Sequence, residues 1–242
     1  MRTLCVDIGG TGIKALLLDA TGKPVTERLR IETPRPAEPD AVVDTISTLV
    51  NGIGAFDRVS VGFPGVVVSG VTRTAPNLST GWADFPLAGT LEARLGKPVR
   101  VANDAGVQGL GVIEGKGTEV VLTFGTGMGF GLYIEGIYVP NIEMGHHPFN
   151  GKKTYEERVS DRVRKRLGSA QWQERVHEVV NQLRPILNWR RIYLGGGNAR
   201  RLDAATFGPD VQIVDNLAGL LGGMRLWADT EGKKKRAPAT KA

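Results

Sequence analysis

Short apolar runs that end in glycine or polar turns dominate this sequence. Residues 3–10, "TLCVDIGG", are mostly apolar up to Gly9-Gly10, which is typical of a buried strand followed by a tight turn. The same pattern recurs along the chain. It predicts strands with their turns in residues 3–10, 13–25, 58–65, 66–74, 98–104, 119–129, 130–139, 191–202 and 211–216.

Apolar residues at helical spacing fill the segments between these strands. Residues 39–51 place apolar side chains three and four positions apart and end before Gly52. By the same criterion, further helices are expected at 84–95, across most of 154–183, at the end of 191–202 and at 216–228. Strands that alternate with helices predict an α/β fold.

Two parts of the chain share one pattern. Residues 6–18 and 122–134 each contain a strand, a turn rich in glycine and threonine, and a second strand, and no short repeat is present. We therefore expect a duplicated α/β unit with a cleft where the strand ends of the two halves meet. The expected domains are residues 1–104 and 105–229, followed by a disordered basic tail at 230–242.

The composition is that of a globular protein with an excess of glycine. Hydrophobic residues make up 41% and charged residues 23%, whereas glycine, at 33 of 242 residues, has about twice its usual share. Glycine permits tight turns and close approach of the backbone to a ligand.

The single cysteine, Cys5, excludes a disulfide framework and fits the cytoplasm. The first apolar run reaches Asp7 too early for a signal peptide or membrane anchor.

Much of the net charge of +6 comes from the C-terminal end of the sequence. Residues 231–242 carry five basic residues against one acidic residue. Such a run is typical of a solvated, disordered end, and a nucleic-acid-binding tail is the alternative. We expect neither a nucleic-acid nor a membrane partner.

Two glycine-rich turns carry the first candidate chemistry. Their backbone N–H groups can converge on an anion, and neither turn has the Gly-Lys-Ser/Thr ending of a Walker loop. A lone turn of this kind is usually a simple hairpin, but two facing copies predict a phosphate chain held between the halves. The candidate phosphate-binding residues are Gly9, Gly10, Thr11, Gly12, Lys14, Gly125, Thr126 and Gly127.

Polar side chains also follow the strands. Asn103 and Asp104 end one strand and begin a helix, where Asp104 is either an N-cap or a general base that accepts a hydroxyl proton. Asn77 lies in a polar loop that is either a turn or a sugar contact. "EMGHH" places Glu143 three residues before His146 and suggests a metal or a polar ligand.

The order of several motifs resembles that of the ROK family of sugar kinases. The motifs are "VDIGGTGIK", "VGFPGVV" followed by "APNL", "AND", "FGTGMG", "EMGHH" and "YLGGG", within residues 3–226. The loop "PNLSTGW" and the segment "TYEERVSDRVRKRLG" are most similar to the polyphosphate glucokinase branch. The resemblance implies a two-domain actin/hexokinase-like (ribonuclease H-like) fold and homodimers.

The resemblance also implies roles for individual residues. Asp104 would act on the 6-hydroxyl of glucose or a close hexose, polyphosphate or ATP would be the donor, and Mg²⁺ would contact Asp7 through water. In most ROK kinases the histidine of this motif binds a zinc that three cysteines complete; no such cysteines follow here, so no zinc is expected. The implied sugar ligands are Asn77, Asn103, Asp104, Glu143, His146 and Glu156, and the implied nucleotide ligands are Gly195, Gly196 and Gly197. His147 has no implied role.

Two questions stay open at this level. An ATP-dependent ROK hexokinase for another sugar is one alternative. A catalytically silent sugar-binding regulator is another, although we expect no DNA-binding segment because a strand is predicted from residue 3. The donor is the second question. Arg158, Arg162 and Lys165 or Arg166 share one predicted helix face, which is either a track for polyphosphate or ordinary solvated surface.

Overall fold

Two five-stranded sheets form the centre of the computed structural model, which describes residues 1–76, 78–215 and 218–228. The first sheet has the order β3-β2-β1-β4-β7 and contains β1 (Thr3–Ile8), β2 (Ile13–Leu18), β3 (Leu29–Ile31), β4 (Arg58–Phe63) and β7 (Val99–Asn103). The second has the order β10-β9-β8-β13-β14 and contains β8 (Thr118–Phe124), β9 (Met128–Ile134), β10 (Ile137–Val139), β13 (Arg191–Gly195) and β14 (Val211–Ile213).

The two sheets have the same topology. In each, the first three strands in chain order form an antiparallel meander, and the next two strands add in parallel to the other side of the first strand. The α/β class and the duplication predicted from the sequence are therefore confirmed. The division into domains at residue 104 stays a prediction.

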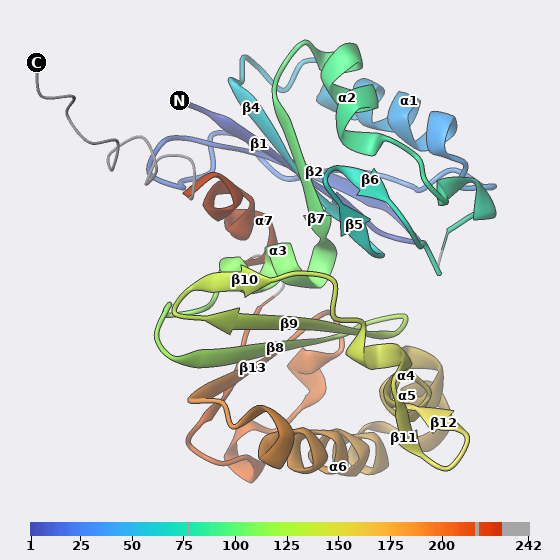
Figure 1. Cartoon of the computed structure of the whole chain (residues 1–242), viewed down its shortest axis with the longest axis vertical. Coiled ribbons are helices and arrows are strands. Elements are labelled where there is room, and N and C mark those ends of the chain that lie inside the picture. The colour runs from blue at the N-terminus through green and yellow to red at the C-terminus, as the bar shows by residue number, and fades with distance from the viewer. Residues whose placement is uncertain (77, 216–217, 229–242) are drawn as a thin grey trace, which may run out of the picture.

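Helices bury one face of each sheet. Helices α1 (Pro39–Val50) and α2 (Leu87–Leu95) cover the first sheet, and α6 (Ser169–Leu187) lies against the second (Figure 1). The apolar stripe of α6, which includes the fully buried Trp172, packs against strand residues such as Phe124. Helix α2 begins three residues later than predicted because Asp84 has a positive φ of 57°.

The region predicted to be mostly helical at 154–183 is divided into three helices. Helix α4 (Tyr155–Val159) ends at Ser160 and α5 (Asp161–Leu167) ends at Gly168, whose φ of 82° favours glycine and stops the helix. The hairpin of β11 (Pro148–Asn150) and β12 (Lys153–Thr154) precedes them and was not predicted. The predicted hairpin at 66–74 is present as β5 (Val67–Val68) and β6 (Val71–Thr72).

Helix α3 (Asp104–Leu110) lies between the two sheets (Figure 1). Its glycines permit this position, because a Cβ on Gly109 would lie 2.0 Å from the Tyr133 hydroxyl oxygen. That hydroxyl donates to the carbonyl of Gly106 at 2.7 Å. Helix α7 (Ala218–Leu221) and the 3₁₀ helix Gly222–Trp227 contact both α3 and β1. The last described residues thus return to the first sheet.

The remaining described elements are single 3₁₀ turns. They are Thr80–Trp82, Met144–His146, Ala199–Arg201 and Ala204–Thr206. The helix predicted at the end of 191–202 is therefore only the 3₁₀ turn Ala199–Arg201. No described helix is long and apolar enough to cross a membrane.

Candidate active site

Asp104 stands at the junction of β7 and α3, on the side where the two sheets approach each other. The helix cap is Asn103 rather than Asp104: the Asn103 side-chain oxygen accepts from the Gly106 N–H at 3.2 Å. Among the described residues, Asp104 accepts only from its neighbour, the Ala105 N–H, to Oδ1 at 2.7 Å. One of its carboxylate oxygens is therefore available to another group.

The surroundings of Asp104 favour its protonated form. Burial contributes most, the negative charges of Asp7 and Glu143 add to it, and the Ala105 N–H and the Lys14 ammonium oppose it. Together they raise the pKa of Asp104 to about 7. A carboxylate with a pKa near neutrality is a stronger base than an ordinary aspartate and is still partly ionised at the working pH.

Two cavities meet at Asp104. One has a volume of about 390 Å³ and the other about 220 Å³. Four residues line both of them: Gly9, Asp104, Thr123 and Gly125. Because Gly9 belongs to the first half and Gly125 to the second, both cavities lie between the halves. A group bound in either cavity can reach the same carboxylate.

The smaller cavity collects most of the predicted sugar ligands. Asn103 Nδ2 donates to Glu143 Oε1 at 3.3 Å, and Glu143 Oε2 lies 3.9 Å from His146 Nε2. Burial and the charge of Glu156 raise the pKa of Glu143, while His146 lowers it. Glu156 accepts from the Met128 N–H at 3.3 Å. The predicted residues that line this cavity are Gly9, Gly10, Thr11, Asn103, Asp104, Gly125, Thr126, Gly127, Glu143, His146 and Glu156.

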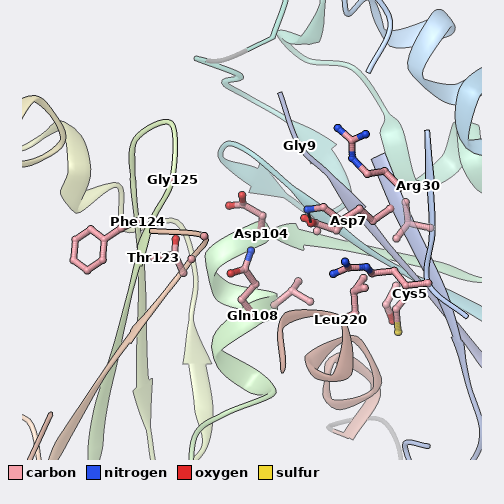
Figure 2. A pocket seen from close by; sticks show the side chains of 18 residues that line it. Cys5, Asp7, Gly9, Arg30, Asp104, Gln108, Thr123, Phe124, Gly125 and Leu220 are labelled. Carbon is pink, nitrogen blue, oxygen red and sulfur yellow. Dashed lines mark hydrogen bonds and ion pairs between the residues drawn. The ribbon is translucent and has the colours of Figure 1, made fainter. Parts of the chain in front are cut away.

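The larger cavity has a cationic wall (Figure 2). Lys14 Nζ lies 2.7 Å from Asp7 Oδ2, and both side chains line the cavity. Arg28, Arg30 and Gln108 also line it and were not predicted. The sequence gives little sign of this, because Arg28 and Arg30 lie in a polar stretch. Only the pairing of β3 with β2, which places Arg30 opposite Lys14, shows that Arg30 lies beside the cavity. The predicted residues here are Asp7, Gly9, Lys14, Asp104, Gly125, Gly196 and Gly197.

The glycine-rich turns are closed by their own backbones. The Gly9 N–H donates to the Gly12 carbonyl at 3.2 Å, and the Gly125 N–H donates to the Gly127 carbonyl at 3.1 Å. A Cβ on Gly127 would lie 1.9 Å from Glu156 Oε2. Glycine at this position therefore allows the Glu156 carboxylate to lie against the turn.

Comparison with known proteins identifies the family to which this arrangement belongs. The ROK family profile matches residues 3–160, which is more than half of the chain.

The chain belongs to the ROK family.

The relatives of this ROK protein include kinases whose names mention polyphosphate, or polyphosphate and ATP, as the phosphate donor. The polyphosphate glucokinase of Mycobacterium tuberculosis is 37% identical over 209 residues, which cover 82% of this chain and 78% of the relative. The polyphosphate glucokinase of Mycobacterium leprae is 34% identical over 84% of this chain and 65% of its own length. The inorganic polyphosphate/ATP-glucomannokinase of an Arthrobacter strain has a similar structure, with a TM-score of 0.86, 31% identity and coverage of 95% of this chain and 99% of that chain.

Some predicted residues of the ROK site lie outside the two cavities. Gly12 lines neither, and Gly195 borders a separate hollow of about 10 Å³. Asn77 lies outside the described residues. His147 is exposed, and its Nδ1 lies 2.8 Å from the carbonyl oxygen of Pro148.

The predicted basic helix face is also divided in this ROK protein. It spans α4 and α5, which are separate helices. Arg158 pairs with Glu178 at 2.6 Å, and Lys165 pairs with Asp161 at 2.8 Å. Neither basic residue lines either of the two cavities described above. Two members of the predicted track are thus neutralised by nearby carboxylates.

The carboxylates beside the larger cavity are suited to one kind of cation. Within residues 1–76, 78–215 and 218–228, no group of three or more His, Cys, Asp or Glu side chains could hold a metal ion. Mg²⁺, however, usually keeps several waters and binds one or two carboxylates together with substrate phosphates. Asp7 offers one such oxygen, and its repulsion of Asp104 is what a cation would relieve. These residues fit a hydrated Mg²⁺.

Proposed function

We propose that this protein transfers a phosphoryl group from polyphosphate or ATP to the 6-hydroxyl of glucose or a close hexose. One observation supports this proposal above the others: Asp104 borders both a polar cavity and a cationic cavity. A base at such a junction can take a proton from an acceptor in one cavity while the donor phosphate lies in the other.

The smaller cavity suits a sugar. Its amide, imidazole and two carboxylates come from Asn103, His146, Glu143 and Glu156, and they offer the donors and acceptors that several hydroxyls require. Glu143 receives a hydrogen bond from Asn103, which fixes its carboxylate for an additional sugar hydroxyl. In this arrangement the 6-hydroxyl would lie next to Asp104.

The transfer then follows from the position of Asp104. Its carboxylate takes the proton of the 6-hydroxyl, and the oxygen forms a bond to the terminal phosphorus of the donor. The phosphorus–oxygen bond to the rest of the donor breaks, and its electron pair stays on the departing phosphate. The products are the sugar 6-phosphate and a donor that is one phosphate shorter, which is ADP when the donor is ATP.

The donor would lie along the larger cavity. Gly9 and Gly125, one from each glycine turn, line this cavity and allow the phosphates to approach the backbone closely, and Lys14 supplies a positive charge that is held by Asp7. Mg²⁺, when bound near Asp7, would neutralise charge on the phosphate oxygens. Val6, Val107 and Leu220 line the same cavity and offer an apolar surface to a nucleotide base.

The names of the relatives support this assignment of donor and acceptor. Polyphosphate glucokinases are 34–37% identical to this chain, and the structurally similar Arthrobacter enzyme is described as using both polyphosphate and ATP. Its description as a glucomannokinase makes mannose a second acceptor to test. The unpaired, buried Cys5 is compatible with the cytoplasm, where we place this activity.

The test is an assay of the purified protein with Mg²⁺ and each donor separately. We expect glucose to be phosphorylated with at least one of the two donors, and nuclear magnetic resonance to locate the ester at the 6-position. Mannose and N-acetylmannosamine serve as alternative acceptors. A preference for another sugar would favour a different ROK hexokinase, and no product with any acceptor would favour a silent sugar-binding regulator.

A further inference from the structure

Arg28 and Arg30 give the larger cavity a feature that the mechanism above does not use. Both side chains line the cavity from the β3 edge of the first sheet, and both are exposed. Figure 2 shows Arg30 on the side of the cavity opposite Phe124 and Thr123, beyond Asp7 when viewed from Asp104. Arg30 thus lies farther along this cavity than the carboxylate of Asp104.

The pairing of the strands explains this placement. Asp7 is opposite Lys14 in β1 and β2, and Lys14 is opposite Arg30 in β2 and β3. Residues directly opposite each other in antiparallel strands project from the same face of a sheet. Asp7, Lys14 and Arg30 therefore form one row that crosses three strands. Arg28 precedes β3 and lines the same cavity as this row.

The charges in this row are not balanced by the protein. Lys14 is paired with Asp7 at 2.7 Å, but no described residue offers a carboxylate to Arg28 or Arg30. Arg30 donates instead to the carbonyl of Thr11 at 3.0 Å, in the first glycine turn. Two cations directly opposite each other, Lys14 and Arg30, are unfavourable unless an anion lies between them. The imbalance therefore indicates an anionic ligand.

The shape of this charge distribution favours a long anion over a compact one. A nucleotide carries its charge on three phosphates and continues as an uncharged ribose and base, whereas polyphosphate remains charged along its whole length. Lys14, Gly9 and Gly125 line the cavity together with Asp104 and can serve the phosphates nearest to it. Additional cations at the sheet edge have a partner only if further phosphates extend there.

We propose that Arg28 and Arg30 bind the phosphates of polyphosphate that lie beyond the reacting end, and so favour this donor over ATP. The proposal rests on the kinase activity proposed above and adds the residues that select the donor. It also replaces the basic face of α4 and α5 as the track for polyphosphate, since Arg158 and Lys165 are occupied by Glu178 and Asp161.

The test compares Arg28→Gln and Arg28→Lys with the parent protein. Arg28 is the better choice for substitution, because Arg30 also contacts the Thr11 carbonyl and its loss can disturb the turn. Arg162→Gln is the matched control: Arg162 is an exposed arginine of α5 that lines neither cavity. For each protein, KM is measured for long-chain polyphosphate, for tripolyphosphate and for ATP, together with kcat. Calorimetry measures binding of long-chain polyphosphate without sugar.

We expect Arg28→Gln to raise KM for long-chain polyphosphate about 10-fold, the size of one charge-assisted hydrogen bond. The proposal requires that ATP and tripolyphosphate do not extend to Arg28, so KM for these two donors should change less than about 2-fold. On a plot of log affinity against log salt, the slope for polyphosphate should become shallower by about 1 in Arg28→Gln. Arg28→Lys should keep the parent slope, and Arg162→Gln should behave as the parent.

Equal changes in KM for ATP and long-chain polyphosphate would overturn the proposal while leaving the kinase activity intact. If only Arg162→Gln lost the use of polyphosphate, the proposal would be overturned, and α5 would be the polyphosphate-binding surface instead. If the parent protein phosphorylated no sugar, the proposed function would fail. The binding of long-chain polyphosphate, measured by calorimetry, would then test whether Arg28 binds this anion. Weaker polyphosphate binding by Arg28→Gln would then support it, and unchanged binding would overturn it.

Discussion

Asn103 donates from Nδ2 to Oε1 of Glu143 at 3.3 Å. Asn103 ends the last strand of the first sheet, and Glu143 lies in the loop after the β9–β10 hairpin of the second. The contact therefore joins the two halves at the smaller cavity. It also orients Glu143, whose pKa is raised mainly by burial, toward a ligand that can donate hydroxyl protons.

Glu143→Gln should weaken sugar binding more than turnover. The amide keeps the shape of the side chain but loses one charged acceptor, so KM for glucose should rise about 10-fold while kcat falls less. Steady-state kinetics with glucose as the varied substrate measure both values. Glu174→Gln, which changes an exposed glutamate of α6, is the control. An unchanged KM for glucose would remove Glu143 from the sugar site.

The pH dependence should report the raised pKa of Asp104. A general base must lose its proton before it can act, so kcat/KM for glucose should fall as the pH is lowered through about 7. An ordinary aspartate would keep the enzyme active to much lower pH. Because donor phosphates also titrate, the profile is measured with saturating ATP and with saturating polyphosphate. A different midpoint with each donor would assign the titration to the donor rather than to Asp104.

Two glycines of the second turn should affect different substrates. In Gly127→Ala the new methyl would lie 1.9 Å from Glu156 Oε2, so the carboxylate must move and KM for glucose should rise about 10-fold. Gly125 lines both cavities, and in Gly125→Ala no atom of the described residues beyond the two chain neighbours is within 4 Å of the new methyl, so KM for the donor should rise in this variant and not in Gly127→Ala. Gly89→Ala, in α2, meets no described atom within 4 Å outside its own helix and serves as the control. The opposite pattern of KM changes would contradict the assignment of the two cavities.

The purified protein should carry no stoichiometric zinc. Structural zinc sites use about four ligands, often cysteines. The single cysteine, Cys5, is buried in β1 and lines the larger cavity, whereas His146 lines the smaller one. Metal analysis and thermal unfolding with a zinc chelator measure this. About one tightly bound zinc per chain, or unfolding on chelation, would show that His146 belongs to a metal site instead.

The sequence was sufficient to predict the strands and their duplication because apolar runs that end in glycine turns are local signals. Residues 3–10 and 119–129 are examples, and both form the expected strand and turn. The division of 154–183 was missed because an extended backbone at Ser160 and a positive φ at Gly168 interrupt an otherwise helical pattern. The hairpin of β11 and β12 was missed because its two strands, of three and two residues, are too short to show a pattern.

The candidate site was predictable where its residues lie in motifs and not where they meet through pairing. Asp104, Glu143 and Glu156 are far apart in the sequence, yet motif order was enough to associate them, and all three line the smaller cavity. Arg28 and Arg30 belong to no motif. Only the register of β3 with β2, which places Arg30 opposite Lys14, brings them to the larger cavity.

Asp104→Asn tests the central claim most directly, because the amide keeps the size and hydrogen bonding of the side chain but cannot take the proton of the 6-hydroxyl. Turnover of glucose with the better donor should fall by about 10²–10⁴-fold. Glucose affinity, measured by calorimetry on the same preparation, should stay within a few-fold of the parent. Asp40→Asn, at an exposed aspartate of α1 that lines neither cavity, should turn over as the parent does. Turnover of Asp104→Asn within a few-fold of the parent would contradict the account.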